Sequence, residues 1–163
     1  MKTLFIVRHA KSSWDDPLQS DFDRPLNERG KKDAPKMAKR LADKKFDVEV
    51  FISSPAKRAK RTAQHFMEAF DAKEKDLILN NILYEASPQA FFASVAAIDD
   101  KFETAAIFSH NPGITAFVNM LTDHMIPNMP TCAVFGVKVH TDSWKDFKDA
   151  KKEVLLFDYP KND

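Results

Sequence analysis

The sequence is short of cysteine and of long apolar runs. It holds one cysteine in 163 residues, so no internal disulfide can form, and Cys132 lies in the apolar segment CAVFGVKV. That setting favours a small buried side chain over a reactive thiol. No apolar stretch approaches the ~18 residues of a membrane-spanning helix, and the N-terminus lacks the pattern of a signal peptide. We therefore expect a cytoplasmic protein without a membrane partner.

Glycine and excess charge are also scarce. Three glycines are too few for a glycine-rich phosphate loop. His65, His124 and His140 lack the spaced carboxylate or cysteine partners of a metal site, so we expect no metal and no cofactor. Lys and Arg number 25 against 24 Asp and Glu, and the basic run KRAKR has no interleaved aromatic residues. This balance argues against a nucleic-acid partner.

Short apolar runs alternate with segments whose apolar residues recur at helical spacing. The expected strands are residues 4–7, 48–53, 77–84 and 104–109 and the segments CAVFGVKVH and EVLLFDY. Strands that alternate with helices form parallel sheets. The sequence therefore predicts an α/β fold in a single domain spanning residues 1–163. Helices should cover both faces of a mainly parallel central sheet, with the last two strands as an edge hairpin.

Polar caps and prolines indicate where the helices begin. Asn27 suits the N-cap of a helix that runs to about Lys44, which Pro35 should kink or restart because proline removes a backbone donor. The polar segment 13–30, before and at the start of this helix, reads as a long loop beside the presumed site. Three other helices are expected where a polar cap precedes proline, at Ser54-Pro55, Pro88 and Asn111-Pro112.

Charged and titratable residues follow each of the first four predicted strands. Arg8 and His9 end the first strand, Arg58 lies within a turn of the second, Glu85 follows the third and His110 ends the fourth. Because the carboxyl ends of parallel strands lie along one edge of the sheet, all five should face one crevice. A single histidine after a strand is more often a packing residue, but five such residues at four junctions are hard to ascribe to chance.

This set of residues suits a phosphoryl group. Two arginines offer planar forks that match phosphate oxygens, and nearby helix N-termini add backbone donors. Cationic neighbours should lower the pKa of His9 and keep the ring neutral, with a lone pair free to attack phosphorus. Glu85 is then placed to protonate the leaving atom and later to take a proton from water.

The motifs that carry these residues are VRHAKS, DRPLNERG, SSPAKRAKRTA, LYEASP and SHNPG, which together span most of the chain. They resemble the histidine phosphatase (phosphoglycerate-mutase-like) superfamily, and most closely its short branch typified by the SixA phosphohistidine phosphatases. The resemblance implies a three-layer sandwich and a metal-independent phosphatase. It also implies that His9 becomes transiently phosphorylated and that Arg8, Arg58 and His110 bind and polarise the phosphoryl group.

The same resemblance gives roles to other residues. Arg24 looks like an additional phosphate or substrate contact, and Glu85 falls where larger members carry the proton donor. Ala10 replaces the superfamily's usual glycine, as in other short-branch members, and we expect an ordinary φ there. Further candidates for contact with phosphate or substrate are Lys11, Ser12 and Asn111.

The length of the chain bears on the substrate. Only one predicted helix separates Glu85 from the fourth strand, whereas mutases and sugar bisphosphatases of the superfamily carry insertions that cover the site. We expect a monomer with an open pocket that admits a phosphorylated protein side chain, above all phosphohistidine, because imidazole leaves easily. Phosphoserine, phosphothreonine and small phosphate esters are alternatives. Another is a non-catalytic module that binds phosphoproteins, although a binder would need only the cations.

Overall fold

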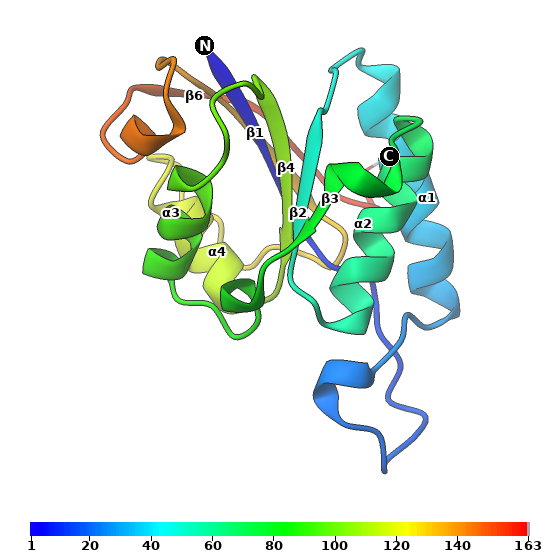
Figure 1. The fold of residues 1–163 in the computed structure, drawn as a ribbon. Helices are drawn as coiled ribbons and strands as arrows, with labels where there is room; N and C mark the ends of the chain where they lie inside the picture. Colours follow the sequence, from blue (N-terminus) through cyan, green and yellow to red (C-terminus); the bar gives the residue numbers. More distant parts are fainter. Residues whose placement is uncertain (163) are drawn as a thin grey trace.

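The computed structural model describes residues 1–162, and a six-stranded sheet runs through its centre (Figure 1). In spatial order the strands are β3 (Leu77–Leu79), β2 (Val50–Ser53), β4 (Thr104–Ser109), β1 (Lys2–Arg8), β5 (Val134–Val139) and β6 (Lys152–Asp158). The first four strands in the chain are parallel, whereas β5 and β6 form an antiparallel hairpin at one edge. The predicted mainly parallel sheet with its edge hairpin is confirmed.

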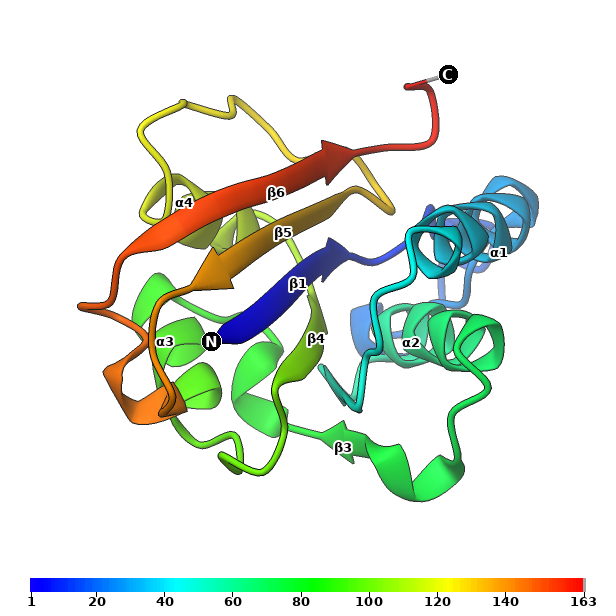
Figure 2. The same ribbon diagram turned by 90° about the horizontal axis from the view of Figure 1, so that it is seen from above.

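Helices cover both faces of this sheet (Figure 2). α1 (Glu28–Asp43) and α2 (Lys57–Ala69) lie on one face, and α3 (Pro88–Ala96) and α4 (Gly113–Asn119) lie on the other. This is the predicted three-layer arrangement. Within residues 1–162, no helix is long and apolar enough to cross a membrane.

Each face of β1 packs into its own core. Leu4 and Ile6 pack with residues of α3 and α4, while Phe5 and Val7 pack with residues of α1 and α2. All four side chains are fully buried. This double burial explains why apolar residues follow one another along β1 without a polar alternation.

The helix α1 agrees with the sequence at its start and differs at its middle. Asn27 is the N-cap, and its side chain accepts a hydrogen bond from the backbone of Gly30 at 2.8 Å. Of the kink or restart predicted at Pro35, the restart is wrong, because α1 is one uninterrupted helix from Glu28 to Asp43. Its buried stripe, which includes Met37 and Leu41, continues past the proline and outweighs the one backbone hydrogen bond that proline removes.

The third strand is shorter than predicted. β3 ends at Leu79, and the rest of the predicted strand 77–84 forms a single turn of 3₁₀ helix over Asn81–Leu83. Asn80 causes the change, because its side chain accepts a hydrogen bond from the backbone of Ile82 and so caps the turn. A side chain that bonds to its own backbone competes with strand pairing in this way.

Two predicted helix caps are also wrong. α2 begins at Lys57 with Ala56 as its N-cap, not at Ser54, and α4 begins at Gly113, two residues beyond Asn111. The Ser54 hydroxyl bonds to the His110 ring and to the backbone of Ala56, and the Asn111 amide bonds to the side chains of Asn128 and Thr115. Each side chain thus links its own segment to another loop and does not cap the helix that follows.

We expect Gly30 not to tolerate alanine. A Cβ at this position would overlap the carbonyl oxygen of Lys11, which accepts a hydrogen bond from the backbone of Asn27. Alanine normally stabilises a helix over glycine by ~0.5 to 1 kcal/mol. Gly30→Ala should instead lower the free energy of unfolding by about 1 to 3 kcal/mol, because backbone must move to admit the methyl group.

Urea unfolding followed by circular dichroism measures this change. Lys32→Ala, at an exposed position of the same helix, is the control and should stay within about 0.5 kcal/mol of the wild type. A Gly30→Ala protein as stable as the wild type would contradict the close approach of the two segments.

Candidate active site

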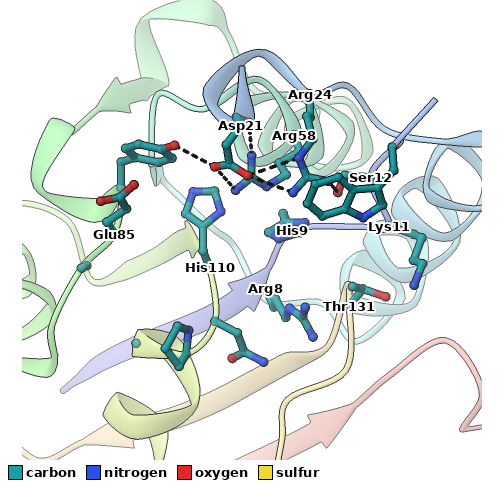
Figure 3. Close-up of a pocket in the computed structure, with 16 residues that line it drawn as sticks. Arg8, His9, Lys11, Ser12, Asp21, Arg24, Arg58, Glu85, His110 and Thr131 are labelled. Carbon is teal, nitrogen blue, oxygen red and sulfur yellow. Dashed lines mark hydrogen bonds and ion pairs between the residues drawn. The ribbon is translucent and has the colours of Figure 1, made fainter. Parts of the chain in front are cut away.

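A pocket opens at the carboxyl ends of β1, β2 and β4 (Figure 3). All nine residues predicted for the site line it: Arg8, His9, Lys11, Ser12, Arg24, Arg58, Glu85, His110 and Asn111. The wall also contains Trp14, Asp21, Tyr84 and Thr131, which the sequence does not single out. The topology of the sheet therefore brings the predicted residues together. Among residues 1–162, no group of three or more His, Cys, Asp or Glu could hold a metal ion.

His9 directly follows β1 and is 6% exposed. Its Nδ1 lies 2.7 Å from the carbonyl oxygen of Ala10. Because a carbonyl only accepts hydrogen bonds, Nδ1 carries the proton and donates it, which leaves the Nε2 lone pair of the neutral ring free. Ala10 is absent from the residues with positive φ in the described chain, so the expected ordinary φ is confirmed.

Burial keeps the His9 ring neutral. It is the largest influence on the pKa of His9, which falls to about 3 although the hydrogen bond to Ala10 acts in the opposite direction. Charge repulsion from His110, Arg58 and Arg8 lowers the pKa further. The direction of the shift agrees with the sequence-based expectation, but its main cause is loss of water rather than the neighbouring cations.

His110 follows β4, and its ring centre lies 5.1 Å from that of His9. Its Nε2 lies 2.7 Å from Oγ of Ser54, and the same oxygen accepts a hydrogen bond from the backbone of Ala56. The Ser54 hydroxyl can then donate its own proton to Nε2 of His110. Nε2 accepts this hydrogen bond with its lone pair, so the proton of the neutral ring is assigned to Nδ1. Burial and then Arg58 lower the pKa of His110 to about 3, so this ring is also neutral.

Three buried nitrogens in this pocket have no hydrogen-bond partner among the described residues. They are Nε of Arg8, Nε of Arg58 and Nδ1 of His110. Other nitrogens of the two arginines are engaged within the protein: Nη1 of Arg8 donates to the Met129 carbonyl at 2.8 Å, and both Nη atoms of Arg58 donate to Asp21. An unpaired buried donor costs ~1 to 3 kcal/mol. These three donors thus call for a ligand rich in hydrogen-bond acceptors.

Asp21 links two of the pocket's arginines, Arg24 and Arg58. Its Oδ2 accepts hydrogen bonds from Nη2 of Arg58 at 3.0 Å and from the Tyr84 hydroxyl at 2.7 Å, and its Oδ1 accepts one from Nε of Arg24 at 3.2 Å. Burial raises the pKa of Asp21, but the bonds from Tyr84 and Arg58 outweigh it and lower the pKa to about 2. In the sequence, the only sign that Asp21 bonds to an arginine is its position three residues before Arg24.

Arg24 is buried between two side chains of the loop that contains it. Its guanidinium stacks on the Trp14 ring at 3.5 Å, and its Nη1 donates to Oγ of Ser12 at 2.8 Å. Ser12 therefore bonds to Arg24 within the protein. The predicted substrate contact at Arg24 stays a prediction, since all of these partners belong to the protein itself.

The remaining predicted residues differ in how far they are engaged. Nδ2 of Asn111 donates to Asn128, and its Oδ1 accepts from Thr115, so this amide links α4 to the loop that contains Asn128. The Lys11 side chain is exposed at the rim. Glu85 has a positive φ of 56° and makes no side-chain hydrogen bond within residues 1–162. Its carboxylate is therefore available to a ligand.

We expect the Asp21 carboxylate to make the stability of the protein depend on pH. Its folded pKa of about 2 lies below the ordinary 3.8, so its contribution is present above pH 4 and is lost as the pH falls toward 2. Asp21→Asn should lower the free energy of unfolding at pH 6, and have less effect near pH 2. Since the side chain is 48% exposed, the loss should not exceed about 1 kcal/mol.

Thermal unfolding at both pH values measures this difference. Asp15→Asn, in the same loop and fully outside the hydrogen-bond network of the two arginines, is the matched control. If Asp21→Asn destabilised the protein equally at pH 6 and pH 2, the ion pair would not be the cause.

Comparison with known proteins identifies the family and supports the fold. The family model for the histidine phosphatase superfamily (branch 1) matches residues 4–91, more than half of the chain. An uncharacterized chloroplastic protein of Arabidopsis thaliana is 29% identical over 161 residues, which cover 89% of this chain and 70% of that protein.

Two solved structures share the fold over nearly the whole chain. One is a protein from Agrobacterium tumefaciens described as a candidate phosphohistidine phosphatase SixA, with a TM-score of 0.82, 24% identity and 98% of each chain covered. The other is the protein histidine phosphatase SixA in complex with tungstate, with a TM-score of 0.82, 21% identity and the same coverage. From the family match and the fold, the chain belongs to the histidine phosphatase superfamily.

Proposed function

We propose that this protein is a phosphatase that removes phosphoryl groups from histidine side chains of proteins, with His9 as the transiently phosphorylated nucleophile. The observation that carries the proposal is the group of three unpaired buried N–H donors beside a neutral histidine whose Nε2 is free. A phosphoryl group offers three oxygen acceptors and one phosphorus to such a site.

The first half of the reaction transfers the phosphoryl group to His9. Nε of Arg8, Nε of Arg58 and Nδ1 of His110 donate hydrogen bonds to its oxygens and neutralise the charge that spreads over them. Nε2 of His9 attacks phosphorus with its lone pair, and the bond to the leaving group breaks. Nδ1 of His9 keeps its proton and continues to donate a hydrogen bond to the Ala10 carbonyl, which stabilises the positive charge of the phosphorylated ring.

The second half returns His9 to its starting state. Water attacks phosphorus, the bond to Nε2 breaks and its electron pair goes back to the ring as the lone pair. The proton that the water loses passes to Glu85 or to a phosphate oxygen. The low pKa of His9, about 3, makes the neutral ring a good leaving group in this step.

The open pocket supports a protein side chain as substrate. Between Glu85 and β4 the chain forms only the short helix α3, so no inserted domain covers the entrance. When the far ring nitrogen of a phosphohistidine carries a proton, the imidazole leaves as a neutral molecule and needs no acid at the bond that breaks. The name of the tungstate-bound relative, a protein histidine phosphatase, supports the same choice.

Glu85 favours a second candidate, hydrolysis of phosphate esters. An alkoxide leaving group must be protonated as it departs, and Glu85 lines the pocket without a hydrogen-bond partner among the described residues. Small esters and phosphoserine would use this carboxyl as their acid. The two candidates therefore differ in how strongly they depend on Glu85.

We expect His9→Ala to abolish turnover, lowering kcat by about 10³-fold or more, because no other group can take the phosphoryl group. Intact-protein mass, measured after an acid-free quench during turnover of an activated aryl phosphate, should show one added phosphoryl group in the wild type and none in the variant. The added mass should disappear on acid treatment.

Binding provides the control for this experiment. Tungstate should still raise the melting temperature of His9→Ala, since the donors of Arg8, Arg58 and His110 remain. His124→Ala, an exposed histidine outside the pocket, should keep wild-type turnover. Turnover by His9→Ala at the wild-type rate would exclude His9 as the nucleophile.

Glu85→Gln should separate the two candidate substrates. We expect kcat/KM to fall about 10²-fold for an alkyl phosphate, which loses its acid, and by less than about 3-fold for a phosphohistidine peptide. Phosphate release measures both, with Glu74→Gln as the matched control at a position away from the pocket. Equal losses on both substrates would overturn the argument from the leaving group.

A further inference from the structure

Residues 13–26, which we call the arm, leave the end of β1 and return to α1. Figure 1 shows the arm projecting past the carboxyl end of the sheet and beyond the ends of α1 and α2. Its base is closed by a hydrogen bond from the backbone of Ser13 to the Pro25 carbonyl at 2.8 Å and by a β-bridge between Ser12 and Leu26. A segment this long without regular strands or long helices is usually functional.

The inner side of the arm is fastened to the pocket. Asp21 bonds to Arg58 and Tyr84, and Arg24 bonds to Ser12. These contacts hold the arm in one position before any ligand arrives. A surface that is already ordered loses little conformational entropy when it binds.

The outer side of the arm exposes large apolar side chains. Leu18 at the tip is 95% exposed, Trp14 is 75% exposed and Phe22 is 38% exposed. Trp14 lines the pocket, and the Phe22 ring packs edge-on against Tyr84, which also lines it. One exposed leucine is ordinary, but three large apolar side chains within nine residues at the rim of a site mark an interaction surface.

The charge of the arm limits what can bind there. Residues 13–26 contain four aspartates and one arginine. That balance repels anionic lipid headgroups and nucleic acids. A small phosphate ester would fill the pocket without reaching Leu18, which does not line it. The ligand of the arm should therefore be a larger molecule. It should carry the phosphoryl group and, next to it, an apolar surface without an excess of negative charge.

We propose that the arm docks the body of a phosphorylated protein, whose apolar residues cover Leu18 and the exposed parts of Trp14 and Phe22 while its phosphorylated side chain enters the pocket. This inference rests on the proposed function and narrows the substrate to a protein segment with apolar residues beside the phosphorylated one. The arm thereby contributes to the choice of substrate, although it does not contact the atoms that react.

Two synthetic helical peptides of about 20 residues, which span ~30 Å, test the proposal. Each peptide carries one phosphohistidine, which is made by treatment with phosphoramidate. The positions that share a helix face with the phosphohistidine are leucine in one peptide and serine in the other. We expect the wild type to prefer the leucine peptide by about 10-fold in kcat/KM, the effect of burying one large apolar side chain.

Leu18→Ser should reduce this preference to about 3-fold or less and leave turnover of an aryl phosphate unchanged. Val154→Ser, which replaces a 46% exposed residue on the edge strand β6, is the matched control and should keep the full preference. The melting temperatures of both variants, compared with that of the wild type, test whether the variants are folded.

The possible outcomes separate the two proposals. If the wild type hydrolyses the aryl phosphate and both peptides but shows no preference, or if Leu18→Ser keeps the preference, docking on the arm is overturned and the proposed function stands. If the wild type releases phosphate from neither peptide nor from the aryl phosphate, the proposed function fails and the docking proposal fails with it.

Discussion

The pocket depends on β1 remaining at the centre of the sheet with both faces buried. β1 pairs with β4 on one side and β5 on the other, and this register sets Arg8 opposite Ser109. At the other end of the strand, the buried Nζ of Lys2 donates to the carbonyls of Asp100 and Phe102 at 2.6 and 3.0 Å. A slip by one residue would turn every side chain of β1 to the opposite face and take Arg8 and His9 out of the site.

Burial also sets the charge of the site. Two histidine rings lie 5.1 Å apart beside Arg8 and Arg58, which remain charged, so a proton on either ring would add a cation where water is scarce. Both pKa values near 3 follow from that cost. The site therefore holds positive charge on the arginines together with a neutral His9, the proposed nucleophile. This combination suits attack on a phosphate dianion.

The sequence predicts those parts of the structure that depend on local pattern. Apolar runs that end in charged residues identify β1, β4 and the residues His9 and His110, because parallel strands carry such residues to a common edge. Asp21 lies beyond this reasoning. Two of its partners, Arg58 and Tyr84, are 37 and 63 residues away in the chain, and the arm has no periodicity that would orient it. The early end of β3 likewise depends on a contact made by one side chain, that of Asn80.

Arg58 explains how the arm can stay in position while a ligand binds. Both of its Nη atoms donate to Asp21, whereas its Nε, also buried, has no partner within residues 1–162. A phosphoryl oxygen can therefore bind at Nε without displacing Asp21. Burial and the bond to Asp21 raise the pKa of Tyr84 to about 12, so its hydroxyl keeps its proton and continues to donate. The arm thus occupies the Nη atoms of this guanidinium and leaves Nε for a ligand, so the arm need not open for the pocket to fill.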